Sequence, residues 1–473
     1  MSNASDRRAL IERLRTRFGE RTVVTDAAAI EPWLTDWRGR WHGAAEAMLQ
    51  PSTTDEVAAI VRSAAQAGVA LVPQGGNTSM VGGATPPEDG SALLLSLRRM
   101  NRIREIDDDH AVAEAGVILA DLHQSAGERG ARFPLTLGSR GSCTIGGLTA
   151  ANAGGTQVLR FGTMRSLVLG IEAVLADGSV HNGLRPLKKD NRGYDLDGLL
   201  VGSEGTLGII TAVNLRLVPA VRERAVAWVG VDDPQDALDL LRGMQRETTA
   251  VEAFEILPED SLQRVLHHIP GTRPPLPGNH RWHVLVEAVA APRDAAAPDL
   301  LLQQLLERAI AAGIVRDAVI AANERQAEAF WRIRDSISEA ERASGPAAQH
   351  DISVPVDAMP RFMIEAAAAV EQAFQGTQAS GFGHLGDGNV HFHVRAPQDR
   401  GAEWIRNEAP AAIRLVHDLV TAEGGSISAE HGIGQMKKEE LLRTAPAARI
   451  QALRAIKHAL DPCGLMNPGK LID

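Results

Sequence analysis

The chain has 473 residues, more than a single hydrophobic core ordinarily organises, so two or three lobes are expected. Apolar residues make up 44% and charged residues 23%, as in globular proteins, and the net charge of −10 argues against nucleic acid as a partner. The only cysteines, Cys143 and Cys463, are far apart, which excludes a disulfide framework or thiolate zinc site and makes a reducing cytoplasm the expected location.

The N-terminal region, residues 1–50, is expected to be a helical lead-in followed by an irregular stretch rich in tryptophan. Residues 1–20 lack the apolar core of a signal peptide and have the pattern of an amphipathic helix. No stretch approaches the about 20 uninterrupted apolar residues that a membrane span requires. Residues 53–68 then predict a helix that opens with a threonine cap followed by acidic residues.

Short apolar runs after this helix predict strands. Such runs occupy residues 69–74, 92–97, 111–117, 167–180 and 208–219. Helical and strand patterns do not alternate as regular βαβ units, so the expected fold class is α+β. After Pro219 the composition shifts to alanine-rich helical stretches that alternate with strands, which indicates a second domain.

Two literal nucleotide motifs are rejected on their context. Residues 381–386 read G-x-G-x-x-G, but an alternating strand follows them where a dinucleotide loop needs a helix. Residues 464–471 resemble a P-loop, but Leu471 stands where Ser or Thr must hold magnesium.

Two other glycine-rich loops, residues 73–83 and 134–155, are better candidates for a phosphate cradle. Glycine allows backbone N–H groups to crowd onto an anion, and the Ser, Thr and Asn residues between the glycines add side-chain donors. Either loop alone is more typical of tight turns between strands. Together they favour a dinucleotide cofactor whose pyrophosphate they hold.

A cluster of histidines follows a predicted turn at Asp387-Gly388. After it, Val390, Phe392 and Val394 alternate with His391 and His393, so one strand face is apolar and the other carries imidazoles. His384, just before the turn, can fold back beside His391. Histidines on a strand face are also common in satisfied cores and interfaces, so this pattern alone leaves a metal site open.

The loop Ser428 to Gly434 adds a glutamate and a histidine, Glu430 and His431. Two histidines and one carboxylate with positions left open are typical of a catalytic divalent site. Zinc is the first choice, and manganese or iron would accept the same ligands.

Residues 331–338 predict the start of a helix that carries Arg334 and Ser338. A guanidinium suits a carboxylate ligand because its planar fork binds both oxygens. The alternative is a surface arginine paired with Asp335 or Glu339.

Six motifs taken in order make the chain recognisable as a family member: PQGGNTSMVGG, TIGGLTAANAGG, KKDNRGYDLDGLLVGSEGTLGIIT, GHLGDGNVHFHV, SAEHGIG and NPGKL. From about residue 51 to its end, the chain resembles the FAD-binding oxidoreductases that include D-2-hydroxyglutarate dehydrogenase, D-lactate dehydrogenase and the flavin subunit of glycolate oxidase. The resemblance implies a vanillyl-alcohol-oxidase/PCMH-type FAD-binding domain at 51–220, an α/β substrate (cap) domain at 221–425 and a C-terminal segment at 426–473 that returns to the flavin.

The resemblance also implies which residues bind FAD. Those expected to cradle the pyrophosphate, line the flavin or close over it are Gln74, Gly75, Gly76, Asn77, Thr78, Ser79, Leu137, Gly138, Ser139, Thr144, Gly147, Asn152, Ala153, Thr156, Glu204, Gly205, Gly208, Ile209 and Asn467. Neither loop offers a His or Tyr for covalent attachment, so FAD is expected to be bound non-covalently, with Cys143 the one residue that can alter this.

The resemblance maps His384, His391 and Glu430 onto metal ligands and His431 onto the general base. Arg334 and Ser338 correspond to substrate-binding positions, and His393 stands where the 2-hydroxyglutarate enzymes carry Asn. Gln349 replaces a lysine that in those enzymes helps to hold the second carboxylate. A neutral amide makes a weaker bond than a charge-assisted one, so the dicarboxylate substrate is placed in doubt and lactate-like acids stay open.

The expected activity is oxidation of a D-2-hydroxy acid such as D-2-hydroxyglutarate or D-lactate to its 2-keto acid. Electrons would pass through FAD to an electron-transfer flavoprotein or a quinone, and a homodimer is a family expectation. The alternatives are a flavin subunit of a glycolate-oxidase-like complex and a non-redox transferase resembling alkyl-dihydroxyacetone-phosphate synthase.

Overall fold

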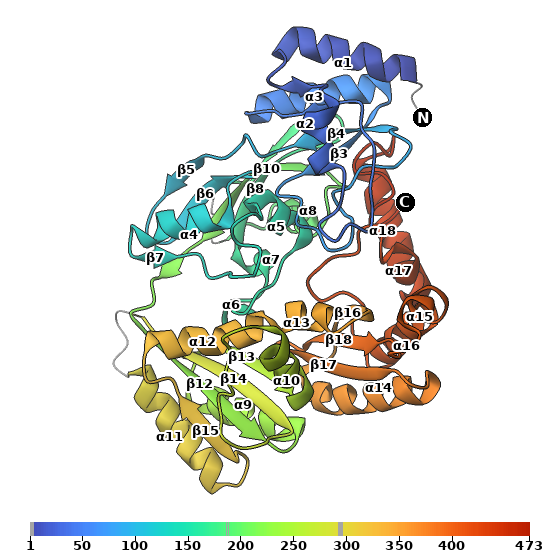
Figure 1. The fold of residues 1–473 in the computed structure, drawn as a ribbon. Helices are drawn as coiled ribbons and strands as arrows, with labels where there is room; N and C mark the ends of the chain where they lie inside the picture. The colour runs from blue at the N-terminus through green and yellow to red at the C-terminus, as the bar shows by residue number, and fades with distance from the viewer. Residues whose placement is uncertain (1–3, 186, 188, 292–296) are drawn as a thin grey trace. The chain divides into compact units, whose positions relative to one another are not determined.

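A computed structural model describes residues 4–185, 187, 189–291 and 297–473 (Figure 1). They form two units: unit 1 contains residues 1–154, 162–219 and 430–473, and unit 2 contains residues 155–161 and 220–429. Helices and strands are mixed in both, so the predicted α+β class is confirmed. No helix in these ranges is long and apolar enough to cross a membrane. Lys188, which opens the third family motif, lies outside the described residues.

Unit 1 contains a four-stranded sheet, ordered β1-β2-β4-β3, and a five-stranded sheet, ordered β5-β6-β10-β8-β9. Its elements are α1 (Ala4–Phe18), β1 (Val23–Val24), α2 (Ala27–Ile30), η1 (Glu31–Trp33), β2 (Met48–Leu49), α3 (Thr54–Ala67), β3 (Ala70–Gln74), β4 (Ala92–Ser96), β5 (Ile103–Ile106), β6 (His110–Glu114), α4 (Leu119–Gly127), β7 (Ala131–Arg132), α5 (Ile145–Ala151), α7 (Met164–Leu167), β8 (Val168–Val174), β9 (Val180–Asn182), α8 (Leu196–Leu200), β10 (Ile209–Arg216), β11 (Val218–Pro219), α17 (Lys438–Thr444) and α18 (Ala447–Leu460).

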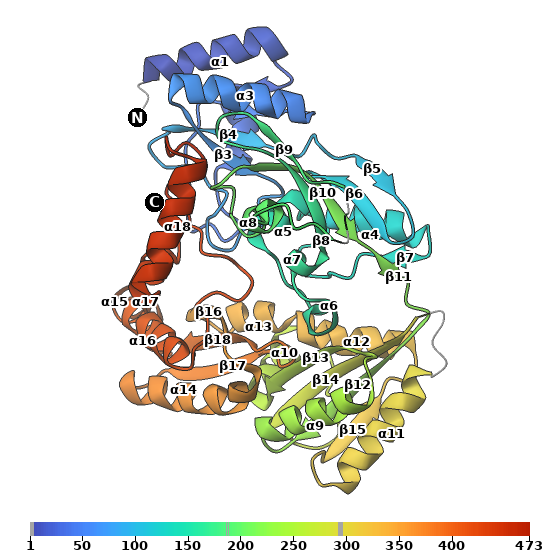
Figure 2. The ribbon, with the colours of Figure 1, turned by 180° about the vertical axis from the view of Figure 1, so that it is seen from behind.

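The predicted N-terminal elements are confirmed. Helix α3 is capped by Thr53, whose hydroxyl accepts from the Glu56 N–H at 3.2 Å, and it ends at Gly68 in the left-handed conformation. Four of the five predicted strand runs contain β3, β4, β8 and β10, and the run at 111–117 overlaps β6, which begins one residue earlier. Helix α1 lies along α3 (Figure 2), where Leu10, Ile11 and Leu14 share its apolar core.

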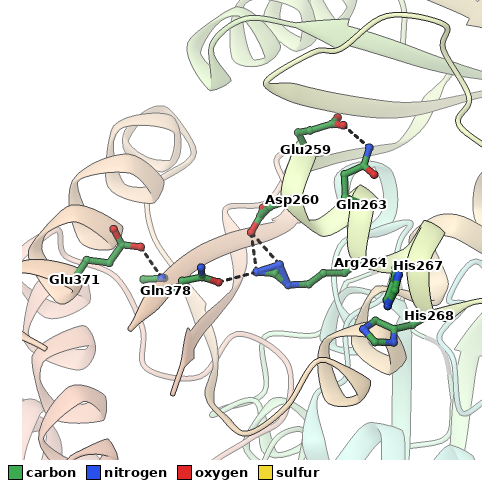
Figure 3. Close-up of a pocket in the computed structure, with 9 residues that line it drawn as sticks. Glu259, Asp260, Gln263, Arg264, His267, His268, Glu371 and Gln378 are labelled. Carbon is green, nitrogen blue, oxygen red and sulfur yellow. Dashed lines mark hydrogen bonds and ion pairs between the residues drawn. The ribbon is translucent and has the colours of Figure 1, made fainter. Parts of the chain in front are cut away.

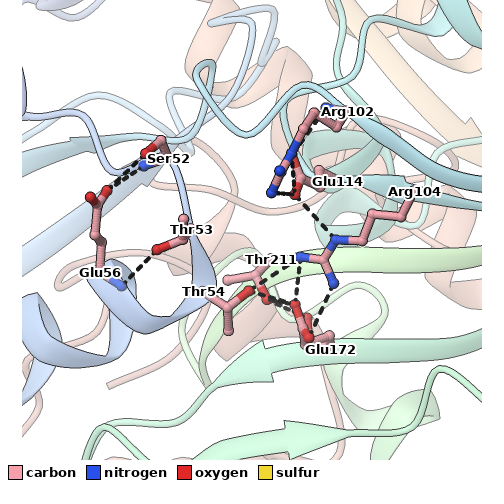
Figure 4. Close-up of polar contacts among 9 residues, drawn as sticks. All are labelled: Ser52, Thr53, Thr54, Glu56, Arg102, Arg104, Glu114, Glu172 and Thr211. Atoms are coloured by element: carbon pink, nitrogen blue, oxygen red, sulfur yellow. Dashed lines mark hydrogen bonds and ion pairs between the residues drawn. The ribbon is translucent and has the colours of Figure 1, made fainter.

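A buried charge network joins α3 to the larger sheet of unit 1 (Figure 4). Arg104 on β5 donates to Glu114 on β6 (3.1 Å) and to Glu172 on β8 (3.0 Å). Thr54 in the first turn of α3 and Thr211 on β10 also donate to Glu172, at 2.6 and 2.9 Å. Although burial opposes ionisation, Arg102 and Arg104 lower the pKa of Glu114 below the ordinary value. Arg104, Thr54 and Thr211 do the same for the pKa of Glu172.

Unit 2 is built on a seven-stranded antiparallel sheet ordered β15-β12-β14-β13-β17-β18-β16. Its elements are α6 (Val158–Phe161), β12 (Glu223–Val231), α9 (Pro234–Glu247), β13 (Val251–Pro258), α10 (Glu259–His268), β14 (Trp282–Ala290), α11 (Pro298–Ala311), β15 (Asp317–Ile320), α12 (Glu324–Asp335), α13 (Ile337–Ala343), β16 (Ala347–Ser353), η2 (Val356–Ala358), α14 (Met359–Ala373), β17 (Gln378–His384), β18 (Asn389–Arg395), α15 (Gly401–Asn407) and α16 (Ala409–Ala422).

The two faces of this sheet are buried against different helices, because successive residues of a strand point to opposite sides. On one face, Val390, Phe392 and Val394 share a core with α9, α11, α14 and α16. On the other, Phe382 shares a core with α10, α12 and α13. The histidines of β18 alternate with its apolar residues, so they lie on the Phe382 face.

Candidate functional site

The two glycine loops predicted to hold a cofactor meet in unit 1. A Cβ atom on Gly75 would lie 2.2 Å from the hydroxyl of Thr144, and one on Gly76 would lie 1.9 Å from the carbonyl oxygen of Ser142. Any side chain at either position would collide with the other loop. The glycines are therefore required for the close approach of the two backbones.

Four of the predicted cofactor residues have left-handed backbones although they are not glycine: Asn77 (φ 55°), Asn152 (φ 50°), Glu204 (φ 52°) and Asn467 (φ 44°). Within the described ranges only Leu471 joins them in this class. Such conformations cost energy and are concentrated at ligand-binding segments. Their coincidence with predicted FAD positions is an observation independent of the motifs.

Glu204 and Asn467 link these loops to the C-terminal segment of the chain. The Glu204 carboxylate accepts from the N–H groups of Ile433 and Gly434, both at 2.7 Å. The Asn467 amide donates to the carbonyls of Gly83 (2.9 Å) and Glu204 (2.7 Å). Burial raises the pKa of Glu204, against the opposing effect of these bonds and of the nearby Lys437 and Lys470.

Three of the predicted cofactor residues have a buried polar atom that makes no hydrogen bond to the described residues: the Gln74 and Asn467 amide oxygens and the Thr144 hydroxyl. Buried polar groups are normally satisfied, so such atoms indicate a missing partner. The two amide oxygens can accept hydrogen bonds and the hydroxyl can donate or accept one. They lie beside the closely packed glycine loops. This combination fits a ligand that has both donors and acceptors, as a dinucleotide has.

The other predicted cofactor residues lie on connected segments. Leu137, Gly138 and Ser139 form the turn before Cys143, and the Ser139 carbonyl accepts from the Cys143 N–H at 2.9 Å. Ser79 accepts from the Gly83 N–H at 3.0 Å. Thr78 follows Asn77 in the first loop, Gly147 lies in α5, and Ala153 lies just after the end of α5. Gly205 lies against Pro73, Gly208 directly precedes β10, and Ile209 begins it. Thr156 belongs to the segment that is grouped with unit 2.

In unit 2 the strand register gathers the predicted histidines on one face. The hairpin β17–β18 confirms the predicted turn and strand, and its pairing sets Phe382 opposite His391, with the ring centroids of His384 and His391 5.8 Å apart. Across β16, Asp351 is opposite His391 and Gln349 is opposite His393. Directly opposed side chains point to the same side of a sheet, so these residues share a surface.

The predicted helix start at residues 331–338 is wrong. Helix α12 begins at Glu324, capped by Asn323, whose side chain accepts from the Gln326 N–H at 3.0 Å. Arg334 is therefore in its last turn, and Ser338 is exposed in the short helix α13. The missed signal is the cap residue Asn323, eight residues before the predicted start at residue 331.

Arg334 is buried, only 8% exposed, so the alternative of a surface pair with Asp335 or Glu339 is wrong. Its Nε donates to Glu255 Oε2 at 2.7 Å, and the other oxygen of Glu255 lies 2.6 Å from His384 Nδ1. Although burial opposes ionisation of Glu255, Arg334 and His384 lower its pKa below the ordinary value. One carboxylate thus joins the predicted substrate anchor to a predicted metal ligand.

Glu430 and His431 follow the last residue of unit 2. Chain continuity holds Glu430 next to Ala429, whose N–H donates to the Asp351 carbonyl at 3.3 Å. Within unit 2, His384 and His391 lie side by side on one face of the sheet, with Asp351 opposite His391. Two imidazoles and a carboxylate are a chemically suitable donor set for a divalent ion.

His393 faces a buried cluster centred on Glu341. Its Nδ1 lies 3.3 Å from the Glu341 carboxylate, which also pairs closely with Arg395 and lies 3.5 Å from Arg264. Glu341 is 1% exposed, and contacts with His393, Arg395 and Arg264 lower its pKa despite the opposing effect of burial. Arg395 and Arg264 are therefore already engaged by an internal carboxylate.

A pocket of about 800 Å³ in unit 2 contains none of the predicted site residues (Figure 3). Its rim carries Arg264, which pairs with Asp260 at 3.2 Å. The residues that line it are Glu259, Asp260, Gln263, Arg264, His267, His268, Glu371, Gln378 and Ala379. One lining residue, Arg264, also lies 3.5 Å from Glu341, the carboxylate that His393 faces.

Sequence reasoning missed Glu255, Glu341 and Asp351. All three are at most 3% exposed, which is unusual for carboxylates without a specific role. A glutamate within the apolar run of β13, VEAFEILP, was a detectable signal for Glu255. Its partners are 79 and 129 positions away, so no local pattern identifies them.

Comparison with known proteins identifies the family of the chain. Residues 45–183 match the FAD binding domain model, and residues 220–471 match that of the C-terminal domain of FAD linked oxidases. The chain is 36% identical over 458 residues to mitochondrial D-2-hydroxyglutarate dehydrogenase of Arabidopsis thaliana, covering 96% of this chain and 80% of the relative. It is 36% identical over 453 residues to D-2-hydroxyglutarate dehydrogenase of Xanthomonas citri pathovar viticola, covering 95% and 94%.

Among solved structures, p-cresol methylhydroxylase with bound substrate has the same fold. It superposes with a TM-score of 0.77 at 16% identity, covering 100% of this chain and 98% of the other. The predicted PCMH-type fold is therefore confirmed.

Proposed function

The chain belongs to the family of FAD-linked oxidases that includes the D-2-hydroxyglutarate dehydrogenases, and from this premise we propose that it is a metal-dependent dehydrogenase of D-2-hydroxy acids. The product is the 2-keto acid. The observation that carries the proposal lies within unit 2: the rings of His384 and His391 are 5.8 Å apart on one sheet face, and Glu255 joins His384 to the buried Arg334.

FAD, when bound, supplies a hydride acceptor for the α-hydrogen of the substrate. The residues of unit 1 that would hold it are those of the loops at 73–83 and 134–155, with Glu204 and Asn467 closing the region. Cys143 is buried, and burial raises the pKa of its thiol, which disfavours the reactive thiolate. This supports non-covalent attachment.

A divalent ion, when bound, supplies Lewis-acid polarisation of the substrate's carboxylate and 2-hydroxyl oxygens. His384, His391 and Glu430 would hold it, and three protein ligands leave positions for those two oxygens. Zinc is the proposed metal, with manganese and iron accepting the same donors.

His431 is proposed to take the proton of the 2-hydroxyl group. An imidazole has an ordinary pKa near neutrality, which suits a general base at physiological pH. Arg334 is proposed to bind the substrate carboxylate through its terminal nitrogens, and Ser338, His393 and Gln349 to contact the rest of the acid. Electrons then leave to an electron-transfer flavoprotein or a quinone.

The test is anaerobic mixing of the purified yellow protein with D- and L-2-hydroxy acids, including lactate and 2-hydroxyglutarate. We expect a D-acid to bleach the flavin absorbance and its L-isomer not to do so. Turnover of the isolated chain with a dye distinguishes it from a flavin subunit that needs partners. Bleaching by the L-isomers alone, or by none of the acids, would contradict the proposal.

A further inference from the structure

Glu255 is a buried carboxylate with two donors from distant parts of the chain. It lies on β13 with a relative exposure of 0%, and it accepts from Arg334 Nε at 2.7 Å and faces His384 Nδ1 at 2.6 Å. A carboxylate in the interior is tolerated only when its charge is compensated and its oxygens are hydrogen-bonded. Glu255 meets both conditions with these two side chains.

The fold fixes this contact on three sides. Pairing of β13 with β17 sets Glu255 directly opposite His384, so their side chains lie on the same face of the sheet. Arg334 reaches the same carboxylate from the last turn of α12. The guanidinium carbon of Arg334 also lies 5.5 Å from the Phe382 ring centroid, which restricts where the guanidinium can turn.

A carboxylate paired with arginine accepts hydrogen bonds but has none to give. The short contact to His384 Nδ1 therefore requires the proton on Nδ1, which leaves the lone pair on Nε2. Nε2 is then the only ring atom of His384 that can bind a metal.

We propose that Glu255 is a positioning residue that fixes the metal-binding tautomer of His384, with Arg334 holding Glu255 in place from its other side. The inference rests on the proposed function, because it assigns Glu255 a role toward the same divalent site. Nothing in the sequence motifs identifies this residue.

Glu255→Gln is the sharpest test because it changes the donor pattern with little change of shape. Arginine cannot accept a hydrogen bond, so the amide oxygen must turn to Arg334 and the amide NH₂ to His384. His384 Nδ1 must then accept, which moves the ring proton to Nε2 and blocks the metal-binding lone pair. We expect zinc affinity of the metal-free protein to fall about 10–100-fold, measured by competition with a chromophoric chelator.

Two further variants distinguish loss of the contact that positions His384 from the general effect of removing a buried charge. Glu255→Asp keeps two accepting oxygens and is expected to retain more zinc affinity than Glu255→Gln. Glu252→Gln is the matched control: Glu252 lies on the same strand, is 1% exposed and pairs with Arg160 at 3.2 Å. It is expected to leave zinc affinity unchanged, and all three variants are expected to retain the flavin absorbance of the wild type.

Wild-type zinc affinity in Glu255→Gln, or an equal loss in Glu252→Gln, would overturn the inference while leaving the proposed function intact. Absence of zinc, manganese or iron binding by the wild type would overturn both. If Glu255→Gln does not fold, NMR of the wild-type metal-free protein with isotopically labelled histidine decides the matter: a proton on Nδ1 of His384 supports the inference, and one on Nε2 overturns it.

Discussion

Single residues carry the strongest evidence for a ligand in unit 1. Asn77, Asn152, Glu204 and Asn467 are held in left-handed backbone conformations, and Asn467 is also 1% exposed with an amide oxygen that has no partner among the described residues. Strained backbone and an unsatisfied buried acceptor each cost free energy. Both costs are explained when a bound dinucleotide supplies the missing contacts.

His431→Ala is expected to slow flavin reduction by the substrate by about 10²–10⁴-fold, because a general base typically contributes that much. FAD should remain bound, since the loops at 73–83 and 134–155 are unchanged. Stopped-flow absorbance under anaerobic conditions measures the rate, and the flavin-to-protein absorbance ratio measures the cofactor content. A variant that reduces its flavin at the wild-type rate would rule out His431 as the base.

Gln349→Lys is expected to favour dicarboxylate substrates. Gln349 is opposite His393 in the β16–β18 pairing, so a lysine there adds a cation to the sheet face that carries the histidines. Arg395 and Arg264 on that side are already paired with Glu341. A charge-assisted bond contributes about 1.5 kcal/mol or more. The ratio of kcat/KM for D-2-hydroxyglutarate to that for D-lactate should rise about tenfold. Gln349→Met provides the uncharged control, and an unchanged ratio in the lysine variant would contradict the expectation.

At the scale of elements, strand register decides which side chains meet. The β17–β18 hairpin and its neighbours β13 and β16 place Glu255, Asp351 and Gln349 opposite the histidines His384, His391 and His393 respectively. A slip of one residue would turn the histidines into the apolar core shared with α14 and α16. The apolar residues of β18 therefore maintain the site as much as its polar residues do.

The network around Glu172 predicts an acid-sensitive link between α3 and the larger sheet of unit 1. The folded pKa of Glu172 is depressed, so its stabilisation is complete above the unfolded value of about 4.3 and is lost as pH falls through the folded value. Glu172→Gln should lower the free energy of unfolding by about 1.5–3 kcal/mol near neutrality, the range for bonds to charged groups. Denaturant titrations should show this deficit shrinking below about pH 4.

Asp190→Asn is the matched control for that measurement. Asp190 is paired with Arg192, which lowers its pKa to about 2, but the pair is exposed and its members are only two residues apart. Exposed pairs of this kind contribute little to folding. A deficit in Glu172→Gln that is the same at neutral and acid pH would show that the carboxylate's charge is not what stabilises the link.

At the scale of the whole molecule, the predicted ligands of FAD and of the metal are different residues. The predicted FAD residues fall in unit 1 except Thr156, whereas two of the predicted metal ligands, His384 and His391, belong to unit 2 and the third, Glu430, begins the last segment of unit 1. Because no residue is assigned to both cofactors, each cofactor should be removable without the other.

Chelation is expected to abolish substrate-driven bleaching while the flavin stays bound. The expected result after dialysis against dipicolinate is full flavin absorbance, no bleaching by the D-acid, and recovery on adding zinc or manganese. Metal analysis before and after dialysis verifies removal. Unaltered bleaching by metal-free protein would exclude a metal role in the reaction.

The sequence by itself determined the α+β class, the FAD family, two N-terminal helices and five strand runs of unit 1, and the hairpin that carries the histidines. These follow from local periodicity, caps, turns and ordered motifs, which act over a few residues. Only the tertiary structure decided that Arg334 is buried, that α12 carries it in its last turn, and that Glu255 joins it to His384. These contacts depend on sheet register and helix packing between segments far apart in the chain, and no short-range pattern encodes them.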